Sequence, residues 1–381
     1  MPDPDYKNQI EKYDYISGQH GGYYRHDFID HAYLYNLYFP PEEVFARFKN
    51  QIHNLVLNYP VAQDVLASLV GQLIHQKPEH IVVGNGAAEL IKIVSGQIAQ
   101  KIVVPVPSFN EYVNAAPRGS AIEFPLESPS FQLDVDKFAA HIIKTGADIA
   151  VVVTPNNPTA MAVPKHDLIR LAEKLSGHDC LLIIDESFID FVQVPDQTSM
   201  EDKIQMYPNI AIFKSMSKAY GICGLRIGYL LTANSKFIKA VRQGVHIWNI
   251  NGFAEEFLRI LPDYRDDFIK SCDQVKKDRD KLYKDLSTFS GVTVYKPDAN
   301  FIFCRLPDTG PNAPELTKKL FIEHNIYIKH CQGKTMPNAD RYIRIAARTK
   351  EENTNLVDAL GSIIGNKNKI DRTGLDEHIK I

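Results

Sequence analysis

The sequence has few of the features that mark secreted, metal-binding or nucleic-acid-binding proteins. Only five of its 381 residues are cysteines (Cys180, Cys223, Cys272, Cys304 and Cys331), and they lie far apart with no C-x-x-C pair. This spacing argues against a disulfide framework and a metal site, and it favours reduced thiols in the cytoplasm. Lys and Arg total 43 against 46 for Asp and Glu, so the net charge of −3 gives no basic surface for nucleic acid.

Long apolar runs are also missing. Runs such as 81–83 and 149–153 are interrupted within a few residues, whereas a membrane helix needs about 20. The first residues, MPDPDYKNQIEKYD, contain neither an apolar segment nor a positively charged leader, so we expect no secretory signal. We therefore expect a cytoplasmic protein whose partners are small molecules or a second copy of itself, and not a membrane.

Short β-branched runs alternate with helical stretches between about residues 80 and 230. The runs are IVVG at 81, KIVVP at 101, IAVVVTP at 149, LLIIDE at 181, NIAIFKS at 209 and LRIGYLL at 225. Uninterrupted apolar runs suit strands that are buried on both faces, and segments 87–100 and 165–175 have the pattern of crossover helices. The pattern predicts a largely parallel α/β sheet.

The two ends of the chain differ from this central region. Residues 262–286 are predicted as one long helix, and beyond them VTVYKP, NFIFCRL and RYIRIA alternate with helical segments 314–324 and 351–364, which predicts a smaller α+β unit. The first ~45 residues are rich in Tyr, His, Asp and Gly and are expected to form an irregular arm. The polar residues 366–381 are expected to form a poorly ordered tail.

The most informative motif is SMSKAYGICGLRIGY, residues 215–229. It combines an amine, two hydroxyls and a guanidinium in one loop-strand unit (Lys218, Ser215, Ser217 and Arg226). This combination suits a lysine that forms a Schiff base with an aldehyde cofactor, beside donors that hold the cofactor's phosphate. The alternative is a solvated loop followed by an arginine at the end of a strand.

Two further motifs supply parts that such a site needs. In VVGNGAAELIKIV a strand and a glycine turn lead into a helix, whose free N–H groups at Gly86, Ala87 and Ala88 suit a phosphate. In LLIIDESF, Asp185 follows four apolar residues, and a buried carboxylate there needs a cation such as a protonated pyridine nitrogen. The alternatives for Asp185 are a helix cap and a structural ion pair.

Two motifs after neighbouring strands could contact an aromatic cofactor. TPNNPTA places the amide of Asn157 in a turn, where it could donate a hydrogen bond to a phenolate oxygen. PSFNEY places Phe109 just after a strand, where its ring could stack on the cofactor or simply belong to the core.

In their order and spacing these five blocks resemble the pyridoxal-phosphate enzymes of the aspartate aminotransferase fold, the class I/II aminotransferases, over essentially the whole chain. Within that family the sequence is most similar to histidinol-phosphate aminotransferases and threonine-phosphate decarboxylases. The resemblance implies a large α/β domain with a mainly parallel seven-stranded sheet and a smaller α+β domain built from both chain ends. The implied boundaries are 1–45 for the arm and part of the small domain, 46–287 for the cofactor-binding domain and 288–381 for the C-terminal small domain.

The resemblance also implies roles for individual residues. Lys218 would form the Schiff base and move protons, Asp185 would pair with the pyridine nitrogen, and Asn157 would bind the ring hydroxyl. Phe109 would stack on the ring, and the cofactor phosphate would be held by Ser215, Ser217, Arg226 and the backbone of residues 86–88. Tyr59 in LNYPVAQ would reach the phosphate of a neighbouring subunit, which implies a homodimer with shared active sites. Arg344 in RYIRIAART would grip the substrate's carboxylate, with an edge-strand salt bridge as the alternative.

Several positions depart from the usual pattern of the aminotransferases. Ala160 stands where glycine is common, so we expect a turn that tolerates a β-carbon. Phe188 replaces a tyrosine, as in the decarboxylases, and GQHGGYYR matches their histidine-glycine-glycine arm, so His20, Gly21 and Gly22 are candidates to close over an anionic substrate. Lys329 stands where the decarboxylases have an arginine, and Arg348 is an extra cation near Arg344.

These residues predict an aminotransferase that exchanges nitrogen between a small amino donor and a keto or aldehyde acceptor, with a phosphate, phosphonate or carboxylate group on the substrate. Decarboxylation of an O-phospho-amino acid is the close alternative, and a non-catalytic regulatory module of the same fold is the second. The intact Lys218, Asp185 and Arg226 argue against the module. Fusion to another enzyme domain is compatible with the sequence, which does not name the substrate.

Overall fold

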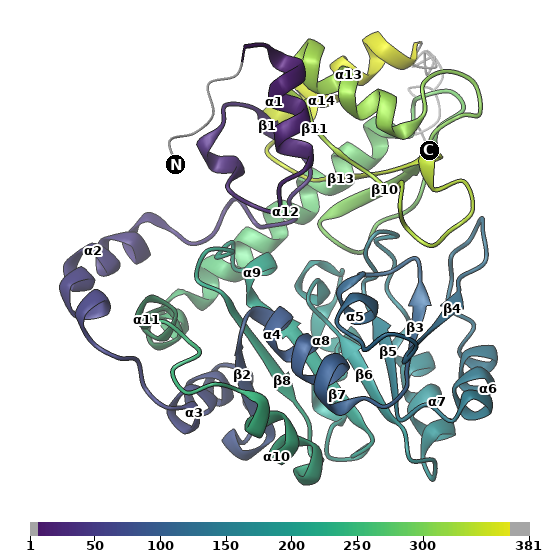
Figure 1. The fold of residues 1–381 in the computed structure, drawn as a ribbon. Helices are drawn as coiled ribbons and strands as arrows, with labels where there is room; N and C mark the ends of the chain where they lie inside the picture. Colours follow the sequence, from purple (N-terminus) through teal and green to yellow (C-terminus); the bar gives the residue numbers. More distant parts are fainter. Residues whose placement is uncertain (1–6, 366–381) are drawn as a thin grey trace, which may run out of the picture.

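A computed structural model describes residues 7–365. In Figure 1 a lower part contains the large sheet and an upper part contains the C-terminal sheet, with the long helix α12 running between them. The predicted tail 366–381 lies outside the described residues. The domain boundaries expected after residues 45 and 287 stay a prediction.

The large sheet is mainly parallel and has seven strands in the order β2-β8-β7-β6-β5-β3-β4. Only β8 runs antiparallel to its neighbours, so the predicted architecture is confirmed. The strands are β2 (Ile81–Asn85), β3 (Ile102–Val106), β4 (Ala121–Pro125), β5 (Ile149–Val153), β6 (Leu181–Asp185), β7 (Ile210–Ser215) and β8 (Ile227–Leu231).

Both faces of this sheet are covered, which explains the uninterrupted apolar runs. Along β6, Leu182 and Ile184 belong to one apolar core, whereas Leu181 and Ile183 belong to the core on the opposite face. Successive side chains of a strand point to opposite faces, so a strand between two layers of helices must be apolar at every position. Each fully buried Leu or Ile contributes about 1.5–3 kcal/mol to the stability of the sheet.

The helices largely follow the sequence pattern. The segment predicted as a helix over 87–100 is α-helical only to Ile93 and ends in a π-helical turn, Val94–Ile98. The predicted helix 165–175 is α7 as expected. The α-helices are α1 (Gln9–Ser17), α2 (Glu42–Leu57), α3 (Gln63–Ile74), α4 (Gly86–Ile93), α5 (Glu111–Asn114), α6 (Val135–Thr145), α7 (Lys165–Leu175), α8 (Pro195–Thr198), α9 (Met216–Ala219), α10 (Ser235–Gly244), α11 (Gly252–Ile260), α12 (Arg265–Leu286), α13 (Ala313–His324) and α14 (Lys350–Ile364).

The second sheet is antiparallel, with the order β12-β13-β10-β9, and has its own apolar core against α13 and α14. Its strands are β9 (Thr293–Val294), β10 (Phe301–Arg305), β12 (Lys329–His330) and β13 (Tyr342–Ala346). Capping boxes fix where the two helices begin, at Asn312 for α13 and at Thr349 for α14.

The N-terminal arm is more regular than the sequence suggested. It contains α1, which begins at the N-cap Asn8 and contacts α13, and the short strand β1 (Ile29–Asp30). β1 pairs in parallel with β11 (Ile326–Tyr327), so the first residues join the C-terminal unit. A short helix that depends on such long-range packing gives only a weak periodic signal.

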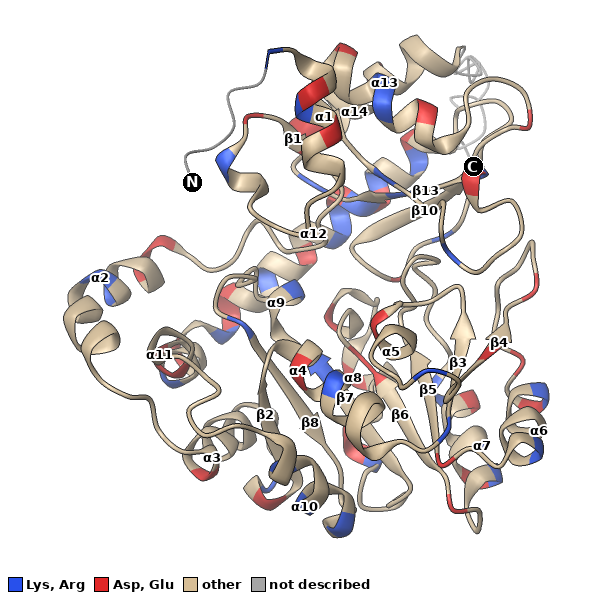
Figure 2. Ribbon diagram, viewed as in Figure 1, with Lys and Arg blue, Asp and Glu red and all other residues tan. Residues whose placement is uncertain are grey.

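The surface has no strong bias of charge. Lys and Arg are interspersed with Asp and Glu over both parts of the molecule (Figure 2), as the small net charge implies. Among residues 7–365, no helix combines the length and apolar character that crossing a bilayer requires.

Candidate active site

A cavity of about 460 Å³ lies at the carboxyl ends of the parallel strands, beneath the C-terminal sheet. Loops that follow β3, β5, β6 and β7 all reach it, because parallel strands bring their carboxyl ends to the same edge of a sheet. The predicted site residues that line it are His20, Ala87, Ala88, Phe109, Asn157, Asp185, Ser215, Ser217, Lys218, Arg226, Lys329 and Arg344.

Asp185 is the last residue of β6 and is 3% exposed. One carboxylate oxygen accepts a hydrogen bond from the Ser187 N–H at 3.0 Å, and the other accepts one from the Tyr112 hydroxyl at 2.9 Å. Burial raises the pKa of Asp185, although these hydrogen bonds and the charge of Lys218 oppose the shift. A buried carboxylate of this kind is stabilised by a cationic partner, such as a protonated ring nitrogen.

Lys218 lies on the short helix α9, directly after β7, with its side chain in the cavity. Its carbonyl oxygen accepts a hydrogen bond from the Asn36 N–H at 2.9 Å, which fixes the backbone at this point. Burial, with help from the charges of Arg344 and Arg226, lowers the pKa of the Lys218 ammonium against opposing effects of Cys223 and Asp185. A lowered pKa increases the fraction of neutral amine, which is the nucleophilic form.

The turn from β2 into α4 and the start of β8 form a cradle for an anion. Gly86 has a φ of 67°, and a β-carbon there would lie 2.4 Å from the Arg226 guanidinium. Only glycine therefore lets Arg226 approach the first turn of α4, where the free N–H groups point outward. The Ser217 hydroxyl lies 3.5 Å from Arg226 Nη1, so hydroxyl, guanidinium and backbone donors converge as a phosphate requires.

Asn157 and Phe109 both line the cavity, on loops from two neighbouring strands. The Asn157 side chain is buried, and its oxygen accepts a hydrogen bond from Arg344 Nη1 at 2.8 Å, which leaves its amide N–H groups available for a ligand. The nearby turn keeps the left-handed conformation typical of glycine, because Ala160 has a φ of 63°. The turn therefore holds the β-carbon of Ala160 in a left-handed conformation, which costs about 1 kcal/mol at this residue.

The opposite wall of the cavity is cationic. Arg344 on β13 and Lys329 on β12 are paired across the sheet, and Lys334 reaches in from the loop between these strands. Lys334 Nζ donates to the Ser108 carbonyl at 2.6 Å and to Asn110 Oδ1 at 2.7 Å. Burial lowers the pKa of Lys329, with a further effect of Arg344, and lowers that of Lys334 to about 8. Hydrogen bonds to neutral oxygens leave these charges available to an anion.

Five residues of the predicted set do not line the cavity, and one of them, Gly86, lies in the turn that lets Arg226 approach α4. Tyr59 is 77% exposed and stacks on Trp248 with 4.2 Å between ring centroids. Gly21 and Gly22 have φ values of 138° and 78° and lie in the exposed turn after His20. Arg348 points away from the cavity, where it forms an ion pair with Glu352 at 2.9 Å. Its position therefore does not supply the extra cation that the sequence suggested at the substrate.

Two further residues belong to the site although the sequence did not predict them, namely Tyr112, which bonds to Asp185, and Lys334, which lines the cavity. Tyr112 lies in the same PSFNEY segment as Phe109, three residues further on, and is completely buried. Its partner Asp185 lies 73 positions further along the chain, so no local signal in this segment indicates the contact. Lys334 lies in a polar loop without periodicity, so no local signal in the sequence indicates that it enters a cavity.

A comparison with protein families matches residues 35–360 to the model "Aminotransferase class I and II". The chain belongs to the class I/II aminotransferase family. The resemblance noted in the sequence is thus confirmed. Enzymes of this family use pyridoxal 5′-phosphate, and the residues of the cavity fit that cofactor: Asp185 suits its ring nitrogen, Lys218 its aldehyde, and the donors around Arg226 its phosphate.

Known relatives differ in their reactions. The chain is 42% identical over 350 residues to a CMP-5′-(3-aminopropyl)phosphonate synthase from Streptomyces rubellomurinus, covering 92% of this chain and 55% of that protein. It is 34% identical over 328 residues to an L-serine phosphate decarboxylase from Sulfurospirillum multivorans, covering 83% of this chain and 81% of that protein.

A solved structure has the same fold. The histidinol-phosphate aminotransferase from Clostridium acetobutylicum matches with a TM-score of 0.80 and 26% identity, over 88% of this chain and 98% of that one. The chain therefore spans nearly the whole of this aminotransferase but about half the length of the phosphonate synthase.

Proposed function

We propose that the protein decarboxylates an α-amino acid that carries a phosphate or phosphonate group on its side chain. The observation that carries this proposal is the cationic wall formed by Arg344, Lys329 and Lys334, which faces the Lys218 amine across one cavity. Three neighbouring cations repel one another, and a ligand with two acidic groups would relieve that repulsion. An amino acid with a carboxylate at one end and a phosphate at the other has this charge.

The names of the relatives favour decarboxylation. One relative is an L-serine phosphate decarboxylase, and the product named for the other contains an aminopropyl phosphonate, whose amine-bearing carbon has no carboxylate. Removal of the α-carboxylate from a phosphonate-bearing amino acid gives such an amine. Transamination, which the sequence favoured as the commoner reaction of this fold, stays the second candidate because of the likeness to histidinol-phosphate aminotransferase.

The protein's own residues can serve this reaction in distinct ways. The donors around Arg226 would hold the cofactor's phosphate, Asn157 its ring hydroxyl and Phe109 its ring face. When bound, the cofactor supplies an electron-withdrawing ring that stabilises the electron pair left at Cα when a bond there breaks. Asp185 would keep the ring nitrogen protonated, which strengthens that effect. Arg344 would hold the α-carboxylate, and Lys329 and Lys334, with His20 closing above them, the second anion.

Lys218 is the group that would move protons. In decarboxylation the Cα–carboxylate bond breaks, carbon dioxide leaves, and the Lys218 ammonium gives one proton to Cα to form the amine. In transamination the neutral Lys218 amine would instead take the proton from Cα. Its lowered pKa gives Lys218 a larger fraction of neutral amine than an ordinary lysine has, and general acid–base catalysis uses both the ammonium and the amine.

The test is an assay of the cofactor-loaded protein with O-phospho-L-serine and with 2-amino-4-phosphonobutanoate, recording both carbon dioxide and keto acid. We expect carbon dioxide and the corresponding amine without any amino acceptor. Turnover that requires 2-oxoglutarate and releases no carbon dioxide would assign transamination instead. Binding of cofactor with no reaction on any phospho- or phosphono-amino acid would favour a non-catalytic module.

We also propose a homodimer in which Tyr59 serves the partner's site. Apolar side chains are exposed at the end of α2 and in the loop after α10, and the Tyr59–Trp248 stack joins the two segments. The exposed residues are Val56, Leu57, Tyr59, Ile247 and Trp248. Burial of such a patch against a second copy is favourable. Sedimentation should show a dimer. Tyr59→Phe should weaken cofactor retention without dissociating the dimer. A monomer with full cofactor occupancy would refute this proposal.

Fusion to a further enzyme domain stays a prediction.

A further inference from the structure

The segment Asp30–Tyr33 links the N-terminal arm to Arg344. The Ala32 carbonyl accepts a hydrogen bond from Arg344 Nη2 at 2.6 Å, while the other terminal nitrogen, Nη1, bonds to Asn157. The remaining nitrogen of the guanidinium, Nε, is buried without a hydrogen-bond partner among residues 7–365. Two of the three nitrogens are already bonded. The position of the Ala32 carbonyl therefore helps to set the orientation of the guanidinium plane of Arg344 toward a ligand.

Asp30 and His31 hold this segment in shape. The Asp30 carboxylate accepts hydrogen bonds from the N–H groups of Ala32 at 2.8 Å and Tyr33 at 3.1 Å, which forms a tight turn. His31 is fully buried, and its Nδ1 lies 2.9 Å from the Ala346 carbonyl, while its own carbonyl accepts from the Ala346 N–H at 2.8 Å. The turn is thereby bonded directly to β13, the strand that carries Arg344.

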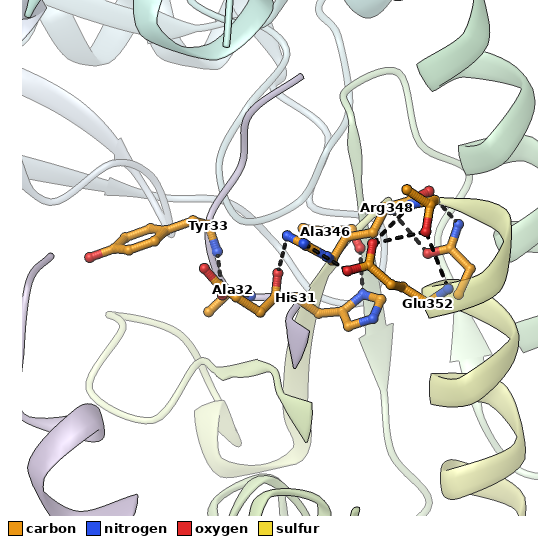
Figure 3. Close-up of polar contacts among 9 residues, drawn as sticks. His31, Ala32, Tyr33, Ala346, Arg348 and Glu352 are labelled. Atoms are coloured by element: carbon orange, nitrogen blue, oxygen red, sulfur yellow. Dashed lines mark hydrogen bonds and ion pairs between the residues drawn. The ribbon is translucent and has the colours of Figure 1, made fainter. Parts of the chain in front are cut away.

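Arg348 lies between this turn and Glu352, as Figure 3 shows. Its Nη1 donates to the Asp30 carbonyl at 2.7 Å, and its Nη2 donates to Glu352 Oε1 at 2.9 Å. Glu352 is itself held, because its other oxygen accepts from the Thr349 hydroxyl at 2.9 Å in the capping box of α14. The Arg348 side chain is only 12% exposed, so its two bonds are well shielded from water.

We propose that Arg348 is a positioning residue, which orients Arg344 for the substrate's α-carboxylate through the Asp30–Tyr33 turn. The connection runs from the first turn of α14 through Glu352 and Arg348 to the Asp30 carbonyl, and from Ala32 to Arg344. Each step is a hydrogen bond or one turn of backbone. This assignment rests on the proposed function only in naming the carboxylate as the group that Arg344 binds.

An arginine is needed because one rigid, planar group must reach two acceptors in different directions. A lysine at this position has a single nitrogen on a flexible stem, so it can neutralise Glu352 without fixing the Asp30 carbonyl. Arg348→Met loses both hydrogen bonds. We therefore expect Arg348→Lys to be more stable than Arg348→Met but to keep only part of the substrate selectivity of the unaltered protein.

The experiment compares two ligands that differ only in the α-carboxylate, O-phospho-L-serine and O-phosphoethanolamine. The purified, cofactor-loaded protein is used in its own oligomeric state. The affinities of the two ligands are measured from the change in the cofactor's absorbance. Arg348→Met should weaken binding of O-phospho-L-serine about tenfold and leave O-phosphoethanolamine within about twofold, since loss of one charge-assisted hydrogen bond costs roughly this much. Arg348→Lys should fall between Arg348→Met and the unaltered protein.

Arg341→Met is the matched control. Arg341 lies just before β13, and its guanidinium also donates to a backbone carbonyl, that of Pro307 at 3.1 Å, but it does not contact the Asp30–Tyr33 turn. Its replacement should leave the ratio of the two affinities unchanged. An Arg348→Met protein that binds both ligands equally less well, or that matches the control, would overturn the assignment.

A second measurement separates this inference from the proposed function. If the unaltered protein binds neither ligand, the proposed substrate class fails, and crystal structures of the unaltered and Arg348→Met proteins then decide about Arg348. Loss of the Arg344–Ala32 hydrogen bond in the variant would support the positioning role. Retention of that bond, with Arg344 in the same orientation, would refute it.

Discussion

The two walls of the cavity are built in different ways. On the cofactor side, Asp185, Lys218 and Arg226 each lie within a few residues of the end of a strand in one continuous sheet. On the substrate side, Arg344 is oriented by Asn157 and Ala32, which lie 187 and 312 positions away in the chain. The first wall is therefore fixed by local sequence and sheet order, whereas the second requires the chain ends to come together. Changes in the Asp30–Tyr33 turn should therefore affect the substrate side more than the cofactor side, where the arm contributes the hydrogen bond from Asn36 to the Lys218 carbonyl.

The largest effect is expected from the cofactor side. Lys218→Ala should abolish covalent attachment of the cofactor and lower turnover by about 10⁴-fold, because both the nucleophile and the proton donor are lost. The cofactor's absorbance and carbon dioxide release measure the two effects. Lys236→Ala, which alters an exposed lysine at the start of α10, is the control and should change neither. Retained turnover in Lys218→Ala would contradict the assigned role.

Asp185→Asn should lower turnover by about 10²–10³-fold without preventing covalent attachment, because the ring nitrogen loses its charged partner but the lysine remains. Tyr112→Phe removes only the 2.9 Å hydrogen bond to this carboxylate and should cost about tenfold. Steady-state kinetics of both variants, with substrate affinity measured separately, would test whether Asp185→Asn loses more turnover than Tyr112→Phe. Equal losses in the two variants would show that Asp185 acts through its hydrogen bonds and not its charge.

The stability of the folded protein should depend on pH through His31, which bonds the arm to β13. Burial lowers the pKa of His31 to about 4, from 6.5 for an ordinary histidine, so the unfolded chain binds more protons than the folded protein between these values. Stability is therefore complete above pH 6.5 and falls as the pH drops toward 4. At pH 5 the loss relative to pH 7 is about 2 kcal/mol from this group.

Denaturant unfolding at both pH values tests this expectation. His31→Gln keeps a donor for the Ala346 carbonyl but has no titratable ring, so its stability should change less between pH 7 and pH 5 than that of the unaltered protein. An identical change in both proteins would mean that His31 does not contribute to the pH dependence.

An effect as small as that of Tyr112→Phe is expected from the titration of Lys334. Its pKa of about 8 means that the ammonium is charged below this pH and loses its charge above it. Affinity for O-phosphoethanolamine should therefore fall about tenfold between pH 7 and pH 9, the cost of one charge-assisted hydrogen bond. In Lys334→Arg the fall should disappear because arginine stays charged, and in Lys334→Gln the affinity should already be low at pH 7. An equal fall in affinity in all three proteins would mean that a group other than Lys334 titrates.

The comparison also explains which residues could be predicted. Asp185 and Lys218 stand directly after apolar runs that form strands, so strand order alone places them at one edge of the sheet. Lys334 follows no periodic segment, and Tyr112 enters the site through a four-residue helix, so neither has a local signal. Arg348 was placed at the substrate because it is close in sequence to Arg344, but the four-residue step carries it off the strand and toward the start of α14.

The sequence by itself determined the large sheet and the cofactor class, because these depend on apolar runs and on residue types at strand ends. Only the tertiary structure decided how the substrate side is arranged. Its bonds join Asp30 to Arg348 and Ala32 to Arg344 across most of the chain's length. Such contacts leave no periodic pattern in either segment, because a carbonyl oxygen is present at every residue and its partner is selected only when the chain has folded.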